Sequence, residues 1–209
     1  MALSFPYALD FLANCMIGER VPLRLQRNDE MSGSGDGRYW SAELARPLWT
    51  ASYSLYAKQE AHAREMNAKV WGLDGMSKTM LWADPNYRGP ASGVTTGLGG
   101  VSVSSVRADR GALSLTGLPV GFTVTAGDFL SIAFGTYVYF GAFVEGGTAG
   151  AGGDLGSREV RPFLPMGIQT QAVELVRPYF KAIVTEYQPF ASTRWHWGDS
   201  ASISILQRP

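Results

Sequence analysis

Glycine and proline divide most of the chain into short runs, and this spacing favours strands over helices. The chain has 25 glycines and 11 prolines among 209 residues. One strong helix pattern remains, at 58–71 (KQEAHAREMNAKVW), where helix-forming residues follow one another without either breaker. We expect this helix to end at Gly72 or Gly75. Its apolar residues recur at helical spacing and predict one buried stripe. These residues are Ala63, Met66, Val70 and Leu73.

The runs around this helix alternate apolar and polar residues, as half-buried strands do. Residues 21–29 and 39–56 flank a glycine-rich loop at 31–38 (MSGSGDGR) and predict a strand–loop–strand unit. A short strand is expected before Pro85, and several more strands later in the chain. Those later runs lie at 112–118, 128–147, 158–164, 173–190 and 201–206. The predicted fold class is therefore mainly β, with one flanking α-helix.

The order of these runs predicts a split domain. Residues 86–100 (NYRGPASGVTTGLGG) lack a hydrophobic period and read as a linker. The short strands at 91–165 predict a small inserted β-barrel. The strands after Met166 are too few to be stable alone, so we expect them to pair with the first part of the chain. The prediction is one β domain formed by 1–90 and 166–209, interrupted by a barrel at 91–165.

Composition excludes several classes of protein. Eighteen Lys and Arg balance eighteen Asp and Glu, so no basic surface for nucleic acid or an anionic membrane is predicted. A net charge of zero also favours association between copies. The single Cys15 cannot form an intrachain disulfide. The N-terminal segment lacks a basic region and is broken by polar residues, so we expect neither a signal peptide nor a membrane span, and a soluble protein made in the cytoplasm.

The segment 72–85 (GLDGMSKTMLWADP) has glycines followed by Lys78 and Thr79, as phosphate-binding loops do. A Walker A loop, however, has four residues between its glycines and a glycine directly before the lysine. It also precedes a helix, whose N-terminus attracts anions, whereas this segment follows a helix C-terminus. The pattern therefore predicts a corner between the helix and a strand.

Other candidate sites are equally weak. His62 has no second metal ligand at a suitable spacing, and His196 lies between Trp195 and Trp197, which suggests either an aromatic rib or a sugar-stacking platform. Asp29 and Glu30 are adjacent and would face opposite sides of a strand. The loop 31–38 offers one carboxylate, fewer than a calcium site needs. We predict no catalytic, cofactor-binding or metal-binding residue, no cofactor, and no enzymatic activity.

Several segments resemble a known family. The run 29–55, the helix and the pattern L-x-G-x-x-x-T-x-x-x-x-D-P at 73–85 resemble distal tail proteins of long-tailed bacteriophages and phage-like gene transfer agents. The phrases GLPVG (117–121), AGDFL (126–130) and VRPFLPMG (160–167) resemble the inserted module of prophage tail proteins. Together these matches cover about residues 28–185.

The resemblance implies a β-sandwich or barrel related to tail tube subunits, and a structural role in the virion. Such proteins form a homohexameric ring at the tail tip that joins the tail tube to the hub or baseplate, and DNA passes through the lumen without being recognised. The implied partners are sister copies, the tail tube protein and hub proteins, with assembly in the host cytoplasm and no membrane insertion. We expect no large galectin-like C-terminal domain of the kind that longer members have, and this departure argues against direct host or sugar binding by this protein. A tail-tube subunit, a hub subunit, a carbohydrate-binding tail module and a cell-wall hydrolase remain alternatives.

A ring requires surfaces that are completed only by neighbours. We expect the glycine-rich loops at 31–38 and 148–156 to become ordered against adjacent copies. The tryptophans are candidates for interface anchors, although a tryptophan in an alternating strand more often faces a core. These are Trp40, Trp49, Trp195 and Trp197.

Overall fold

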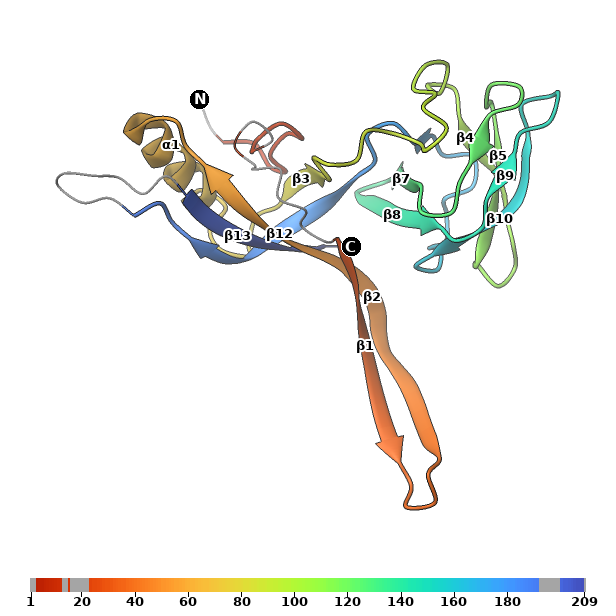
Figure 1. Ribbon diagram of the computed structural model, residues 1–209, viewed down its shortest axis with the longest axis horizontal. Helices are drawn as coiled ribbons and strands as arrows, with labels where there is room; N and C mark the ends of the chain where they lie inside the picture. Colours follow the sequence, from red (N-terminus) through yellow and green to blue (C-terminus); the bar gives the residue numbers. More distant parts are fainter. Residues whose placement is uncertain (1–2, 13–14, 16–22, 192–199, 209) are drawn as a thin grey trace.

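The computed structural model describes residues 3–12, 15, 23–191 and 200–208. It is mainly β with one helix, which confirms the predicted fold class. Two units lie side by side, and a long two-stranded hairpin projects from between them (Figure 1). No helix in the described ranges has the length and apolar character that a membrane crossing requires.

The first unit is a five-stranded antiparallel sheet assembled from both ends of the chain. Its strand order is β1-β2-β13-β12-β3. The two C-terminal strands pair with strands that are far away in sequence. Strand β13 pairs with β2, and β12 pairs with β3. The alternation at 201–206 holds, because Ala201, Ile203 and Ile205 are buried. The bounds are β1 Arg24–Gly33, β2 Tyr39–Tyr56, β3 Met80–Ala83, β12 Tyr179–Gln188 and β13 Ser200–Gln207.

The one helix among the described residues, α1 (Glu60–Trp71), packs on this sheet as predicted. All four residues of the predicted stripe are buried, so this face of the helix contributes to the same core as the inner face of the sheet. On its outer face Glu60 pairs with Arg64, and Glu65 lies 2.6 Å from Lys69. Such pairs, one turn apart, stabilise a helix modestly.

The second unit is a small barrel. Its six-stranded sheet has the order β11-β7-β8-β10-β5-β4, with β6 and β9 paired at one side. The amide of Val103 donates to the carbonyl oxygen of Gln171 (3.0 Å), and Val173 donates to Val101 (2.9 Å). These bonds join β4 to β11 and close the sheet on itself. The bounds are β4 Ser102–Val106, β5 Ala112–Thr116, β6 Thr123–Val124, β7 Phe129–Phe134, β8 Tyr137–Phe143, β9 Gly147–Thr148, β10 Leu155–Arg161 and β11 Val173–Glu174.

The chain returns from the barrel later than the predicted residue 166. Ile168, Val173 and Leu175 are buried in the barrel core, and the first sheet resumes only at Tyr179. The physical reason is the closure described above, since β11 is needed to complete the barrel. The residues around 86–100 form turns without strands and are tied to the barrel through Asp128, whose carboxylate accepts a hydrogen bond from the amide of Ala91 (2.8 Å).

The glycine-rich segment 148–156 is ordered within the chain, contrary to the expectation that neighbours would order it. The amide of Leu118 donates to Gly153 (3.0 Å), and Thr116 Oγ1 donates to Asp154 (2.7 Å). Gly153 has φ +75°, and a Cβ there would overlap the carbonyl oxygen of Leu118. Glycine at position 153 therefore allows the close approach of two backbone segments in a fixed turn.

Aromatic residues fasten the two units together. The indole N–H of Trp49 on β2 donates to the carbonyl oxygen of Phe140 on β8 (3.0 Å). The Trp49 ring also meets Phe129 and Phe140 edge-on, with ring centroids 5.8 and 5.5 Å apart. Because Trp49 is buried, this contact fixes the base of the projecting hairpin against the barrel.

Candidate functional site: the arm and the pocket at its root

The outer part of the β1–β2 hairpin, which we call the arm, extends away from both cores. It comprises Asn28–Gly33 of β1, the loop 34–38 and Tyr39–Arg46 of β2. Every residue of the arm is exposed except the half-buried Ser34. A strand rises about 3.3 Å per residue, so the arm reaches about 30 Å beyond the root of β2. Figure 1 shows it leaving the body nearly alone.

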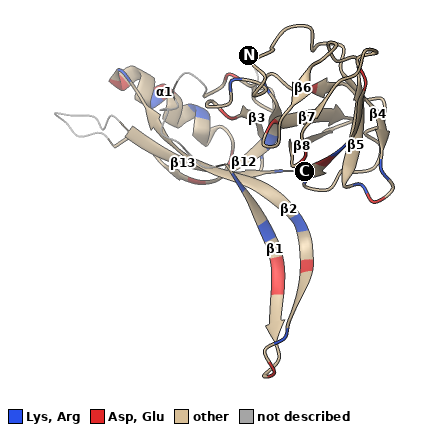
Figure 2. Ribbon diagram, turned by 45° about the vertical axis from the view of Figure 1, so that its right-hand side comes forward, with Lys and Arg blue, Asp and Glu red and all other residues tan. Residues whose placement is uncertain are grey.

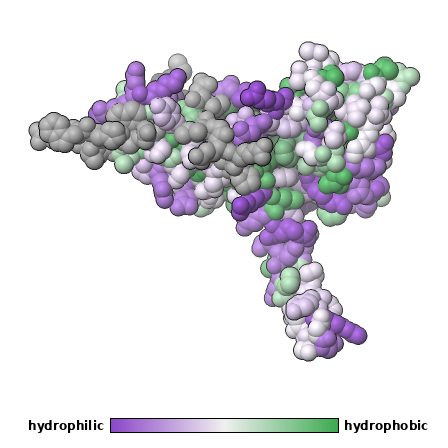
Figure 3. Space-filling model, in the orientation of Figure 1, coloured by the Kyte–Doolittle hydropathy of each residue, from purple (hydrophilic) through white to green (hydrophobic). Residues whose placement is uncertain are grey.

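One face of the arm carries an apolar stripe. Successive side chains of a strand point to opposite faces, which places Trp40 and Ala42 of β2 together, and the exposed Leu44 follows at the register shift opposite Asn28 and Asp29. Trp40 is 59% exposed and Leu44 63%. Charged residues of both signs occur along the hairpin (Figure 2), and pale to green apolar surface interrupts the purple of the arm in Figure 3. Large apolar side chains that are exposed together commonly mark an interaction surface.

Both edges of the arm are also open. On one side β1 has no strand partner in the described part of the chain. On the other, β2 pairs with β13 only as far as Thr50, which lies opposite Leu206, so Tyr39–Trp49 has β1 as its single neighbour. Unpaired edges present free N–H and C=O groups that readily pair with another strand.

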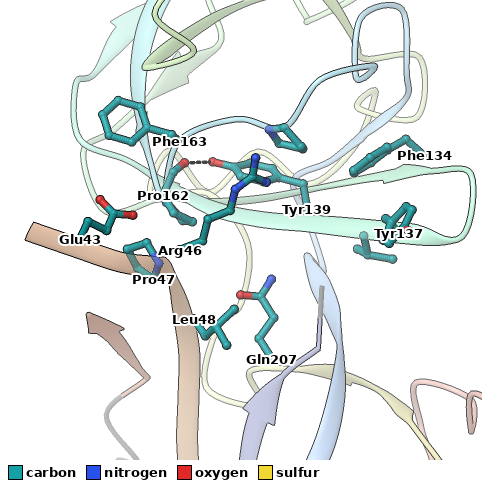
Figure 4. Close-up of a pocket in the computed structure, with 12 residues that line it drawn as sticks. Glu43, Arg46, Pro47, Leu48, Phe134, Tyr137, Tyr139, Pro162, Phe163 and Gln207 are labelled. Atoms are coloured by element: carbon teal, nitrogen blue, oxygen red, sulfur yellow. Dashed lines mark hydrogen bonds between the residues drawn. The ribbon is translucent and has the colours of Figure 1, made fainter. Parts of the chain in front are cut away.

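A pocket of about 280 Å³ lies at the root of the arm, between β2 and the barrel (Figure 4). Apolar side chains dominate its walls, and Arg46, Glu43 and Gln207 supply polar groups at its margin. Its floor is fixed, because Gln207 accepts a hydrogen bond from the amide of Trp49 (3.2 Å). The apolar lining consists of Pro47, Leu48, Phe134, Tyr137, Val138, Tyr139, Pro162, Phe163 and Pro165.

The aromatic walls of this root pocket differ in exposure. Tyr139 is 6% exposed, its hydroxyl donates to the carbonyl oxygen of Pro162 (2.6 Å), and burial raises its pKa. Tyr137 and Phe163 are half exposed at the mouth, and the guanidinium of Arg161 lies 4.8 Å from the Phe163 ring centroid. The pocket thus has a buried, hydrogen-bonded tyrosine in its wall and an accessible aromatic rim, and the residues that line it include no polar cluster suited to acid–base chemistry.

The segment 72–85 is a corner, as predicted. It leads from the end of α1 through turns to β3, and the amide of Lys78 donates to Leu73 (3.1 Å). Asp74 and Gly75 adopt positive φ values of 52° and 63° to make the bend. The amide groups of this corner close the helix end.

His62 contacts Cys15, and the distance from His62 Nε2 to Cys15 Sγ is 3.6 Å. Burial raises the pKa of the Cys15 thiol, so this contact does not generate a thiolate nucleophile. Asp29 pairs with Arg27 at 2.6 Å, and Glu30 lies on the opposite face of β1. Within the described ranges, no group of three or more His, Cys, Asp or Glu residues could hold a metal ion.

The remaining candidates have separate outcomes. In the loop 31–38, Asp36 is satisfied locally by Ser34 and by the amide of Arg38 (3.2 Å), and the Ser34 hydrogen bond lowers its pKa. Trp40 and Trp49 diverge, since one is exposed on the arm and the other is buried. The predicted aromatic cluster Trp195, His196 and Trp197 lies outside the described residues.

The root pocket was not predicted, because its walls come from four distant parts of the chain. Pro47, Tyr139 and Gln207 stand on the separate strands β2, β8 and β13, Phe163 lies in the loop after β10, and no short motif links them. The exposed arm was not predicted either, because its residues alternate like those of a strand that covers a core. A usable signal was present in the predicted strand lengths, because 39–56 is far longer than the run at 201–206 that pairs with it.

Comparisons with known proteins add no family assignment. A scan against protein-family models finds no match, and a search of curated proteins finds no significant relative.

Proposed function

We propose that this protein is a structural virion subunit that forms a ring at the distal end of a long phage tail and joins the tail tube to the hub or baseplate. The single observation that carries this proposal is the arm, which has an apolar stripe and two open edges. The family resemblance supplies the location and the homohexamer, and the arm supplies a physical reason for assembly.

An isolated two-stranded hairpin is marginally stable in water, because it buries little apolar surface. The arm is such a two-stranded hairpin, and it nevertheless extends about 30 Å from the body. Contact with neighbouring copies would cover Trp40 and Leu44 and satisfy the edge amides of β1. Since the arm and the surface that receives it differ, the contact is head-to-tail, and such contacts close into rings when the rotation allows.

The rest of the chain fits a static role. Its aromatic junction at Trp49 and the closed barrel hold the arm at a fixed angle, as a ring subunit requires. In this proposal the protein acts by assembly without catalysis or cofactor, and DNA passes through the lumen. A tail-tube or hub subunit would use the arm in the same way, and its position in the tail would distinguish it.

The test is the mass and shape of the purified assembly. Native mass spectrometry and negative-stain microscopy of the full chain, alone and with the tail tube subunit, should give a closed ring in multiples of 22.6 kDa. A shortened-arm variant, in which Asp29–Glu43 is replaced by Asn-Gly, should keep the wild-type thermal melting of the body and remain a monomer. A wild-type chain that stays monomeric under both conditions, or a ring that forms without the arm, would refute the proposal.

A further inference from the structure

The size of the root pocket restricts what it can hold. Pockets for small organic ligands usually enclose about 300–1,000 Å³. At about 280 Å³, the root pocket falls below this range and suits one large side chain or two smaller ones. Its prolines and aromatic rings favour a flat apolar group, and a protein side chain of that kind is an indole or phenol ring.

The arm carries such groups near its tip. Tyr39 is 73% exposed and Trp40 59%, directly after the loop 34–38. They cannot fill the pocket of their own chain, because Trp40 and Pro47 of the pocket wall are seven residues apart on the same extended strand, which is about 23 Å. Each copy therefore has an aromatic tip and a pocket that only another copy can bring together.

The charges at the two ends are complementary. The tip has Asp36 and Arg38, which are strongly exposed and lie 3.6 Å from each other, while the margin of the pocket has Arg46 and Glu43, which lies 4.0 Å from Arg27. Docking in which Asp36 faces Arg46 and Arg38 faces Glu43 would pair opposite charges around an apolar centre. Protein interfaces commonly combine an aromatic centre with a polar rim.

We infer that the root pocket receives Trp40 from the arm of a neighbouring copy. This inference rests on the proposed ring and specifies its contact. Because the donor tip and the acceptor pocket are different surfaces, two copies in contact leave one tip and one pocket free. Addition of copies therefore continues until the last tip reaches the first pocket.

Site-specific photo-cross-linking tests this contact while keeping an aromatic ring in the pocket wall. A Tyr137→p-benzoylphenylalanine variant of the full chain is mixed with isotope-labelled wild type and irradiated, and mass spectrometry locates the intermolecular cross-links. We expect them to fall within residues 38–42 of the other copy. The same probe at Val120, which is 71% exposed on a barrel turn away from the pocket, is the positional control and should not mark the arm.

A second pair of variants shows whether Trp40 is the occupant. Trp40→Ala should reduce the cross-link several-fold, whereas Trp71→Ala, which removes an equally exposed tryptophan from the end of α1, should leave it unchanged. Cross-links that fall elsewhere in an intact ring, or a yield that is indifferent to Trp40→Ala, would overturn the inference and leave the ring standing. A chain that gives neither a ring nor an intermolecular cross-link would remove both proposals.

Discussion

The two tryptophans of β2 should respond to the same substitution in opposite ways. Trp49 is 6% exposed and Trp40 is 59% exposed. Replacing Trp49 by alanine removes its hydrogen bond to Phe140 and its edge contacts with two phenylalanines, and it leaves a cavity at the junction of the units. Large-to-alanine changes at buried aromatic sites cost about 3–5 kcal/mol. That is a large part of the total stability of about 5–15 kcal/mol that a folded domain has.

Trp40→Ala should instead leave the free energy of unfolding within about 0.5 kcal/mol of wild type, as substitutions at exposed sites usually do. Its effect should appear in association. An indole of this exposure offers about 150 Å² of apolar surface to a neighbour, and complete burial would contribute about 3–4 kcal/mol. Part of this free energy is offset by the cost of immobilising the side chain and the arm on association. We therefore expect Trp40→Ala to weaken association by at least about 2 kcal/mol, which raises the dissociation constant roughly 30-fold.

Urea unfolding at low protein concentration, followed by circular dichroism, measures the first quantity. Sedimentation velocity over a concentration series measures the second. Trp71→Ala is the matched control, because Trp71 is also exposed (64%) but lies on α1, and it should change neither value. If Trp40→Ala lowered the urea midpoint as much as Trp49→Ala, or if it assembled like wild type, the assignment of the arm as an interaction surface would be wrong.

Three further substitutions test the fold and its charges. Burial raises the pKa of Asp84 above 3.8, so the ionised carboxylate opposes folding, and the stability of the protein falls as pH rises through the folded pKa. Asp84→Asn should therefore raise the melting temperature at pH 7. The same substitution should make no difference to the melting temperature well below pH 3.8. Gly153→Ala should cost more than about 2 kcal/mol in urea unfolding because of its positive φ and the overlap described above, while Gly156→Ala, with open space around its Cβ position, should stay within about 0.5 kcal/mol. The hydrogen bond from Arg107 holds the pKa of Asp109 at about 2, so the ionised Asp109 stabilises the fold above pH 3.8, and this stabilisation is lost as pH falls through about 2. Asp109→Asn should therefore have a lower melting temperature than wild type at pH 7. A difference in melting temperature that is as large at pH 2 as at pH 7 would contradict this sign.

Local sequence patterns predicted the elements whose own residue spacing shows which face is buried, whichever element packs against that face. The helix α1 followed from four apolar residues at helical spacing, and β13 followed from a strict alternation that ends at Leu206. Both patterns reflect the face that a segment buries, whichever element covers it. The segment 148–156 was wrongly expected to depend on neighbours, because its composition shows the freedom of glycine and conceals the close approach at Gly153.

The arm could not be recognised from alternation, because Trp40, Ala42 and Leu44 repeat like a strand that covers a core. A pattern shows that one face is apolar, but it cannot show whether the covering surface belongs to the same chain. The root pocket depends on register and closure over long sequence separations, which place Pro47 beside Tyr139 and Phe163. Neither relation has a local signature.

Amide hydrogen exchange in the arm tests the central claim that its edges and apolar stripe are covered by sister copies. Exchange is measured by mass spectrometry for residues 24–48, over concentrations at which sedimentation separates free chains from assemblies, with the tail tube subunit added if the chain alone stays free. We predict that protection of these amides rises with the assembled fraction, while the barrel amides at 129–143 stay equally protected throughout. Assemblies whose arm amides exchange as fast as those of the free chain would contradict the account.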